Sequence, residues 1–187
     1  MKLTNLSTLL FTVLLGTTPS LTAHATVSGK GLLTGDALNI APGKKGTVIL
    51  FMSAVCPCSN SHVEIVKKLA DKFADFAFVG VHSNADETPQ VSQSYFKTAA
   101  FAFPIIEDSK ARLADEYKAL KTPHAFVLSP EGKVLYRGGI TSSTVGETAD
   151  KQFLKDALED VSAGRDVRVA EGRSLGCTIS RGVKNVW

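Results

Sequence analysis

A short apolar segment that runs directly into two cysteines limits what this chain can fold into. Residues 48–54 read Val-Ile-Leu-Phe-Met-Ser-Ala, a nearly uninterrupted hydrophobic run that is typical of a strand buried on both faces of an α/β sheet. Cys56 and Cys58 follow at once, and apolar residues then recur at helical spacing at Val63, Val66, Ala70 and Phe73. The pattern predicts a buried strand, a sharp turn at the cysteines and an amphipathic helix.

The position of Cys56 at this strand-to-helix junction has a chemical consequence. Pro57 lacks an N–H group and suits the first helical turn, which leaves Cys56 at the N-cap position. Unpaired backbone N–H groups and the positive end of the helix dipole stabilise an anion there. We therefore expect a lowered thiol pKa for Cys56, which makes it the candidate nucleophile. Cys58 is close enough to form a disulfide with Cys56, although the ring is small and strained.

The start of the chain has the three regions of a secretory signal peptide. Lys2 precedes an apolar core over residues 9–15, and the small residues Ala23-His24-Ala25 mark a cleavage site. The core is too short to span a bilayer, so the pattern favours cleavage after Ala25 over a membrane anchor. We expect a secreted protein of the periplasm, a compartment where disulfides persist.

Charge and cysteine content narrow the possible functions. The chain has 21 basic residues, one of them in the signal peptide, against 18 acidic ones, and no basic cluster is visible. This balance argues against nucleic acid or a membrane surface as a partner after signal cleavage. The three cysteines, Cys56, Cys58 and Cys177, are an odd number, so one disulfide leaves one free thiol or an intermolecular partner.

Strands and helices alternate along the rest of the chain. The predicted strands cover residues 76–82, 103–106, 124–129 and 133–137, the last two joined by the turn Pro130-Glu131-Gly132. Predicted helices cover about residues 88–98 and 150–163, with a shorter one between them that Asp108 or Ser109 caps. This order predicts an α/β fold of three layers, in which helices cover both faces of one mixed sheet.

Three motifs together resemble the thioredoxin fold. Phe51 and Cys56 stand five residues apart at the strand-to-helix junction, Thr122-Pro123 precedes a strand, and the hairpin ends in Tyr136-Arg137-Gly138-Gly139. In thioredoxin-fold proteins this proline is cis and packs against the active-site cysteines. The resemblance therefore implies that Pro123 shapes the site, with Thr122 beside it.

The spacing between Cys58 and Pro123 leaves room for an extra strand and helix between about residues 77 and 100. This insertion resembles the redoxin branch, which includes the peroxiredoxin-like AhpC/TSA proteins and the periplasmic thiol oxidoreductases. The resemblance covers about residues 45 to 163. Together with the residue patterns, it divides the chain into a signal peptide (1–25), a loosely structured lead-in with room for a short strand (26–46), a thioredoxin-like redoxin domain (47–163) and a C-terminal tail with Cys177 (164–187).

This resemblance implies an exported thiol-disulfide oxidoreductase that acts on protein thiols or disulfides and needs no cofactor. Cys56 would attack a disulfide, and either Cys58 or Cys177 would resolve the mixed disulfide. Cys177 lies in the tail, outside the predicted core, so a mobile tail thiol would have to fold back onto Cys56. The alternative is a structural disulfide through Cys177 that fastens the tail.

A peroxide is the alternative substrate. Peroxiredoxins carry a Pro-x-x-x-Thr-x-x-Cys motif, and Ser53 supplies a hydroxyl three residues before Cys56, although Ile49 stands at the proline position. Arg137 is the candidate for the arginine that holds the reactive thiolate in that family. Peroxide would convert Cys56 to a sulfenic acid, which Cys177 or Cys58 would resolve.

Histidines near the cysteines raise a second alternative, a copper or zinc chaperone. His124 follows the expected cis-proline, where a protonated imidazole would further lower a thiol pKa. His82 ends a strand at the same edge of the sheet, and His62, four residues after Cys58, is expected on a solvated helix face. The candidate metal ligands are Cys56, Cys58 and His62, with His124 or His82, since thiolate and imidazole suit both metals.

Overall fold

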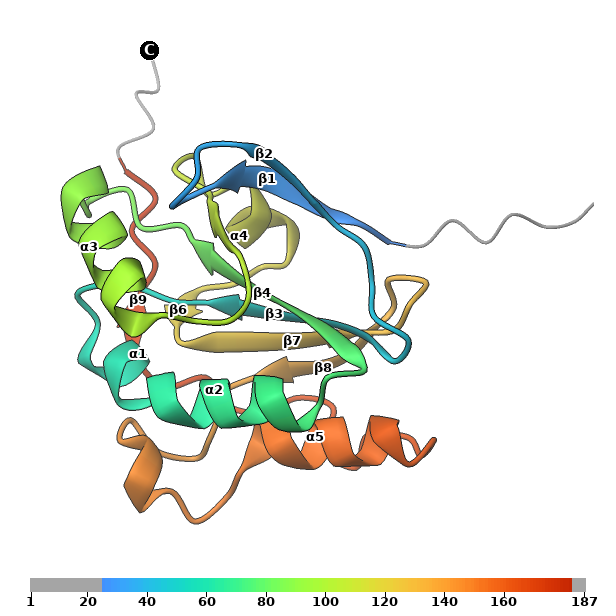
Figure 1. Cartoon of the computed structure of the whole chain (residues 1–187). Helices are drawn as coiled ribbons and strands as arrows, with labels where there is room; N and C mark the ends of the chain where they lie inside the picture. The colour runs from blue at the N-terminus through green and yellow to red at the C-terminus, as the bar shows by residue number, and fades with distance from the viewer. Residues whose placement is uncertain (1–24, 183–187) are drawn as a thin grey trace, which may run out of the picture.

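The computed structural model describes residues 25–182, so the predicted signal peptide lies outside the described residues except for Ala25. Within the described part, seven strands form one mixed sheet in the order β2-β1-β5-β4-β3-β7-β8 (Figure 1). These strands are β1 (Val27–Gly31), β2 (Ala37–Ile40), β3 (Gly46–Phe51), β4 (Phe76–His82), β5 (Ile105–Glu107), β7 (His124–Leu128) and β8 (Val134–Gly138).

The central strand β3 joins the two halves of the sheet. It pairs in parallel with β4 on one side and antiparallel with β7 on the other. The helices of the chain are α1 (Pro57–Ser61), α2 (Val63–Lys72), α3 (Pro89–Ala99), α4 (Arg112–Glu116) and α5 (Phe153–Ser162), with a 3₁₀ turn η1 (Gly146–Thr148). None of the described helices is long and apolar enough to cross a membrane.

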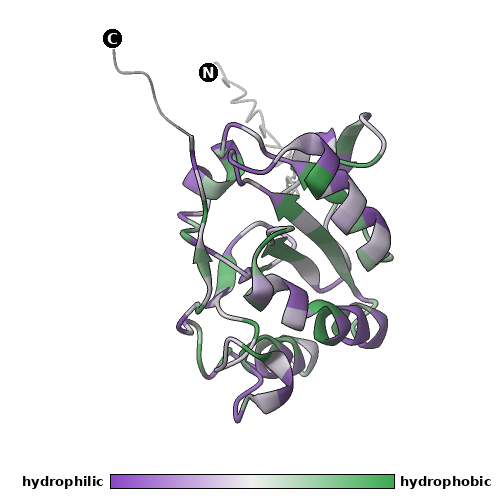
Figure 2. Ribbon diagram, turned by 90° about the vertical axis from the view of Figure 1, so that its left-hand side faces the viewer, coloured by the Kyte–Doolittle hydropathy of each residue, from purple (hydrophilic) through white to green (hydrophobic). Residues whose placement is uncertain are grey.

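Every residue of β3 is buried, as the uninterrupted apolar run predicts. Alternate side chains face opposite sides of the sheet: Val48 and Leu50 pack in a core with residues of α2, α3 and α5, whereas Ile49 and Phe51 pack in a second core with residues of α4. Figure 1 shows α2 and α5 side by side on one face, and Figure 2 shows the hydrophobic central strands. The predicted three-layer α/β fold is confirmed.

The predicted insertion is also present. Helix α3 falls within residues 77–100, and its N-cap Thr88 accepts a hydrogen bond from the Val91 N–H. Strand β5 follows and pairs in parallel with β4. Asp108 accepts hydrogen bonds from two backbone N–H groups at the start of α4, although Ala111 occupies the N-cap position itself.

The lead-in has more regular structure than the loose segment with a short strand that the sequence analysis expects. Residues 27–40 form a hairpin, in which β1 pairs antiparallel with β2 and, through its other edge, with β5. The Gly-rich composition hid this hairpin from a search for apolar periodicity. Gly29 is needed because a Cβ there would lie 2.4 Å from a side-chain atom of Ile106, so the glycine marks close packing rather than a loop.

The tail is folded against the domain instead of lying outside it. Residues 170–181, called here the C-terminal strap, first bond to β8, where the Arg137 N–H donates to the Ala170 carbonyl at 3.0 Å. The strap then forms strand β9 (Cys177–Thr178), which pairs antiparallel with β6 (Lys121–Thr122). Ile179 is buried in the core on the α4 face, and this apolar anchor explains why the segment is ordered.

Replacing Leu50 with alanine tests the buried status of β3. Because Leu50 is fully buried between sheet and helices, we expect Leu50→Ala to lower the free energy of unfolding by about 2–5 kcal/mol. Leu33 is half-exposed, so the chemically identical change Leu33→Ala should cost less than about 0.5 kcal/mol. Urea denaturation followed by circular dichroism measures both, and equal losses would contradict the assignment.

Candidate redox site

Three thiols meet where β3 ends. Cys56 is the N-cap residue of α1, with Pro57 in the first turn, as the sequence predicts. The Cys56 thiol donates a hydrogen bond to the Thr122 carbonyl at 3.1 Å, and the expected cis peptide bond is present between Thr122 and Pro123. Strand pairing places Cys177 directly opposite Thr122. All three cysteines are free thiols in this structure.

The surroundings of Cys56 favour its thiolate. Its side chain is 1% exposed, and burial by itself would raise the thiol pKa. The neighbouring Cys177 thiol and the Ser59 and Cys177 backbone N–H groups stabilise the thiolate, and these effects outweigh burial and lower the pKa of Cys56 to about 7. A substantial fraction of Cys56 is therefore ionised at neutral pH, as the sequence analysis expects.

The other two thiols are shifted in the opposite direction. Burial and the neighbouring Cys56 charge raise the pKa of Cys58. The hydrogen bond that Cys177 donates to Cys56, together with burial, raises the pKa of Cys177 to about 11. One thiol of lowered pKa thus lies beside two thiols of raised pKa, and this difference favours Cys56 as the candidate nucleophile.

A buried carboxylate beneath Cys56 was missed by the sequence analysis. The Glu87 side chain is 1% exposed and accepts hydrogen bonds from the Ser53 hydroxyl at 2.5 Å, the Ala54 N–H at 2.8 Å and the Asn84 amide at 2.5 Å. His82 Nε2 lies 3.1 Å from the same carboxylate. Burial alone would raise the pKa of Glu87, but these hydrogen bonds lower it to about 2.

Glu87 acts on Cys56 through Ser53. The Cys56 N–H donates to the Ser53 hydroxyl oxygen at 3.1 Å, while that hydroxyl donates to Glu87. This chain fixes the backbone of the turn that carries the nucleophile. A signal for Glu87 does exist in the sequence: it follows the end of β4, and the carboxyl ends of parallel β3 and β4 meet at one edge of the sheet.

His62 is buried rather than solvated, contrary to the expectation. Its Nδ1 lies 2.7 Å from the Cys58 carbonyl and its Nε2 lies 2.9 Å from the Thr141 hydroxyl. The ring of His62 occupies the Cys58 carbonyl, which the His62 backbone N–H would bond in a continuous α-helix. That N–H donates to the Ser59 carbonyl instead, and the helix is interrupted between α1 and α2. Burial also lowers the pKa of His62, so this histidine has a structural role.

His124 follows the cis-proline as expected, but it does not carry the positive charge that the sequence analysis considers. Burial, helped by the positive charge of Arg137, lowers the pKa of His124 to about 4. His124 is therefore neutral at pH 7 and cannot stabilise a thiolate as an imidazolium. Arg137 pairs with Glu171 at 2.8 Å.

The candidate metal ligands are not grouped as a metal site in the described residues. Among residues 25–182, no group of three or more His, Cys, Asp or Glu side chains is arranged to hold a metal ion. Both ring nitrogens of His62 are engaged in hydrogen bonds, and His82 is engaged with Glu87. His62 and His82 therefore serve the protein's own hydrogen-bond network.

Replacing Glu87 with glutamine should destabilise the fold in a pH-dependent way. At pH 7 the neutral amide is a weaker hydrogen-bond acceptor than the carboxylate, and its own N–H groups face the donors that surround Glu87. We therefore expect the free energy of unfolding to fall by about 2 kcal/mol. The folded pKa lies below the ordinary value, so the carboxylate's contribution is complete above about pH 4.5 and is lost as the pH falls toward about 2.

The difference in unfolding free energy between wild type and Glu87→Gln should accordingly shrink over that pH range. Urea titrations at pH 7, 4 and 3 measure it. The exposed Glu147 provides the control variant, Glu147→Gln, which should differ little from wild type at any pH. A difference for Glu87→Gln that stays constant with pH would show that the carboxylate is not ionised in the folded state.

Comparison with known proteins gives a family and a fold. The family model described as "AhpC/TSA family" matches residues 34–137, whereas a search of curated proteins gives no match. A crystal structure of an uncharacterised conserved protein from Geobacillus kaustophilus superimposes with a TM-score of 0.74 at 21% identity. That superposition covers 84% of this chain and 89% of the other.

Two further structures support the same fold. A hypothetical protein from Sinorhizobium meliloti 1021 has a TM-score of 0.71 at 25% identity and covers 83% of this chain and 91% of its own. A secreted Mycobacterium tuberculosis disulfide oxidoreductase has a TM-score of 0.55 at 16% identity, covering 71% and 94%. Since the family model spans more than half of the sequence, the chain belongs to the AhpC/TSA family of thioredoxin-fold redoxins.

Proposed function

We propose that this protein is an exported thiol-disulfide oxidoreductase in which Cys56 is the nucleophile. The observation that carries the proposal is the contact of one thiol of lowered pKa with two thiols of raised pKa beside a cis-proline. Membership of the AhpC/TSA family supports thiol chemistry in general. Export rests on the predicted signal peptide, whose cleavage would leave the lead-in, the redoxin domain and the tail as the mature protein.

The reaction uses two cysteines in sequence. The Cys56 thiolate attacks one sulfur of a substrate disulfide, forms a mixed disulfide and releases the first substrate thiolate. A second protein thiol, once deprotonated, then attacks Cys56 and releases the other substrate thiolate. The substrate gains two electrons, and the protein keeps an internal disulfide. Run backwards, the same steps oxidise a substrate dithiol.

Cys177 is the better placed partner for Cys56. Its thiol hydrogen bond is the largest of the interactions that favour the Cys56 thiolate, and β9 presents it across from Thr122. Cys58 also contacts Cys56, but only Pro57 separates the two in sequence, which strains the ring. We therefore propose a Cys56–Cys177 disulfide in the oxidised protein, with Cys58 as the alternative partner.

Peroxide reduction is a second candidate function, and the AhpC/TSA family membership favours it. Here the Cys56 thiolate attacks a peroxide oxygen, the other oxygen leaves with a proton as water or an alcohol, and Cys56 becomes a sulfenic acid. Cys177 would then form the disulfide and release water. The position of Arg137 beside Glu171 leaves this chemistry without the expected arginine, so we rank it second.

Removing the Cys177 thiol should raise the Cys56 pKa. In a Cys58→Ser background we expect Cys56 to titrate near pH 7, and the added change Cys177→Ala should raise its pKa by about one because a hydrogen bond to the thiolate is lost. Cys177→Ser keeps a hydroxyl donor and should restore most of the effect. Thiolate absorbance in the ultraviolet follows the titration, and identical curves for all three proteins would contradict the proposed contact.

Mapping the disulfide tests the proposed function directly. We expect the mature protein, oxidised by a small disulfide, to contain a Cys56–Cys177 bond, detected by alkylation and peptide mass spectrometry, with Cys58 alkylated. Parallel samples treated with one equivalent of hydrogen peroxide report on the second candidate function. Cys56→Ser should abolish bond formation with either oxidant.

Each pattern has a separate meaning. A Cys56–Cys58 bond would keep the oxidoreductase proposal but replace Cys177 as the partner. A Cys56–Cys177 bond that peroxide produces and disulfides do not would favour the peroxidase. Three unreacted thiols after both treatments would overturn both functions.

A further inference from the structure

A pocket of about 410 Å³ opens beside the redox site, between the segment around Pro123 and the C-terminal strap. This volume lies in the range of sites that bind small molecules. Two hydrogen bonds fix the wall that the strap provides: the Gly172 N–H donates to the Arg137 carbonyl at 2.9 Å, and the Ser174 hydroxyl donates to the Pro123 carbonyl at 2.8 Å. The pocket is thus built by tertiary structure and is not a gap beside a loose tail.

Positive charge dominates the pocket. Its lining includes Lys118, Lys121, Arg137 and Arg173, and Glu171 is the single acidic side chain among the lining residues. Glu171 pairs with Arg137 at 2.8 Å, which leaves three cations without an acidic partner in the lining. The chain as a whole is nearly balanced in charge, so this concentration of positive charge marks a site for an anion.

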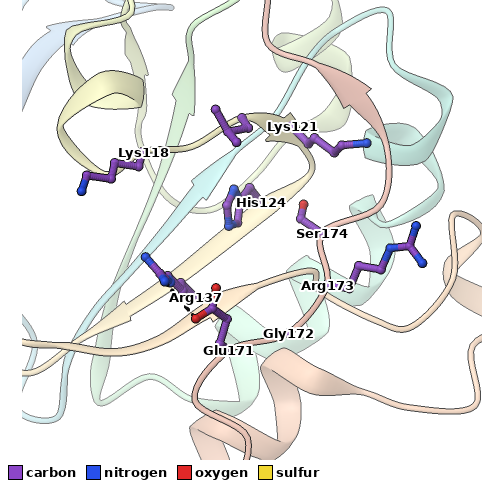
Figure 3. Close-up of a pocket in the computed structure, with 9 residues that line it drawn as sticks. Lys118, Lys121, His124, Arg137, Glu171, Gly172, Arg173 and Ser174 are labelled. Carbon is purple, nitrogen blue, oxygen red and sulfur yellow. Dashed lines mark hydrogen bonds and ion pairs between the residues drawn. The ribbon is translucent and has the colours of Figure 1, made fainter.

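His124 lines the pocket with a neutral ring. Figure 3 shows its ring between Lys118 and Arg137 on one side and Lys121 and Arg173 on the other. Its Nδ1 is buried and makes no hydrogen bond to any described residue. This nitrogen is closed to solvent, so a molecule in the pocket meets other atoms of the His124 ring.

The pocket lies within reach of Cys177. Ser174 on its wall is three residues before Cys177, so at most about 11 Å of extended chain separates them. From the other side, Lys121 pairs with Thr178, the residue that follows Cys177. Cys177 is exposed, whereas Cys56 is 1% exposed. A molecule held in the pocket can therefore meet the sulfur of Cys177 before that of Cys56.

We propose that this pocket binds the carboxylate of a small anionic thiol, of about tripeptide size, that reduces the Cys56–Cys177 disulfide by attacking Cys177. The inference rests on the proposed function, because it requires that disulfide to form. An upper limit on the size follows from the chain between Ser174 and Cys177, which spans at most about 11 Å, about the length of an extended tripeptide.

The chemistry balances with two molecules of the thiol. The first thiolate attacks the Cys177 sulfur, the protein disulfide breaks, and Cys56 leaves as the thiolate. Cys56 is the better leaving group because its pKa is the lower of the two. A second thiolate attacks the bound thiol's sulfur in the mixed disulfide, and Cys177 leaves and takes up a proton. The protein gains two electrons, and the two small thiols become one disulfide.

The test compares glutathione with glutathione diethyl ester as reductants of the oxidised mature protein. The two reagents share one skeleton and one thiol, but only glutathione has free carboxylates. Rates are divided by the thiolate concentration of each reagent, and dithiothreitol, which is uncharged, measures how easily each protein's disulfide is reduced. At low salt we expect wild type to react about tenfold faster with glutathione than with the ester.

Charge removal should reduce this preference. Lys118→Gln and Arg173→Gln should each lower the ratio of the two rates, and the double variant should bring it near one. In wild type, 0.5 M sodium chloride should have the same effect, because the Debye length is then about 4–5 Å. Lys110 is exposed and lies outside the pocket lining, so Lys110→Gln is the matched control and should keep the wild-type ratio.

The outcomes separate the two proposals. Equal rates for glutathione and its ester in wild type, with normal reduction by dithiothreitol, would overturn the pocket proposal and leave the proposed function intact. A preference that survives both the double variant and high salt would also overturn it. A Cys56–Cys58 bond in place of the Cys56–Cys177 bond would overturn the pocket proposal and leave the oxidoreductase function intact, whereas three unreacted thiols would overturn both.

Discussion

The contact between the Cys56 thiol and the Thr122 carbonyl, 3.1 Å long, joins segments that are 66 residues apart in sequence. It brings the end of β3 against the cis-proline loop before β7, and the pairing of β6 with β9 then adds the strap as a third segment. Because three segments converge on one sulfur, Cys56 is buried and still surrounded by hydrogen-bond donors. That combination lowers its pKa where burial alone would raise it.

The buried Glu87 carboxylate holds the turn that carries Cys56 through hydrogen bonds. Glu87 is a charged group in a buried position, which is stable only because Ser53, Ala54, Asn84 and His82 surround its carboxylate. The same carboxylate would repel a thiolate, but Cys56 meets the Ser53 hydroxyl and not Glu87 itself. Glu87 therefore orders the turn through its neighbours, as a positioning residue.

The strap links the redox site to the basic pocket. Its first part bonds to β8 and forms one wall of the pocket, and its second part carries Cys177 to Cys56. Ile179 anchors the far end in the core. Since both ends are fixed, Cys177 stays beside Cys56 without a disulfide, and the resolving thiol that we propose is already in place in the reduced protein.

The sequence by itself determined the strand-turn-helix around Cys56, the α/β fold and the resemblance to redoxins. These features depend on local patterns: an unbroken apolar run, helical spacing, and turn residues that act over a few positions. Glu87, the course of the strap and the neutral state of His124 depend on tertiary structure, because each arises from segments that meet only after folding. Burial and partner charges set the ionisation of Cys56, Glu87 and His124, and neither can be read from residues that are adjacent in sequence.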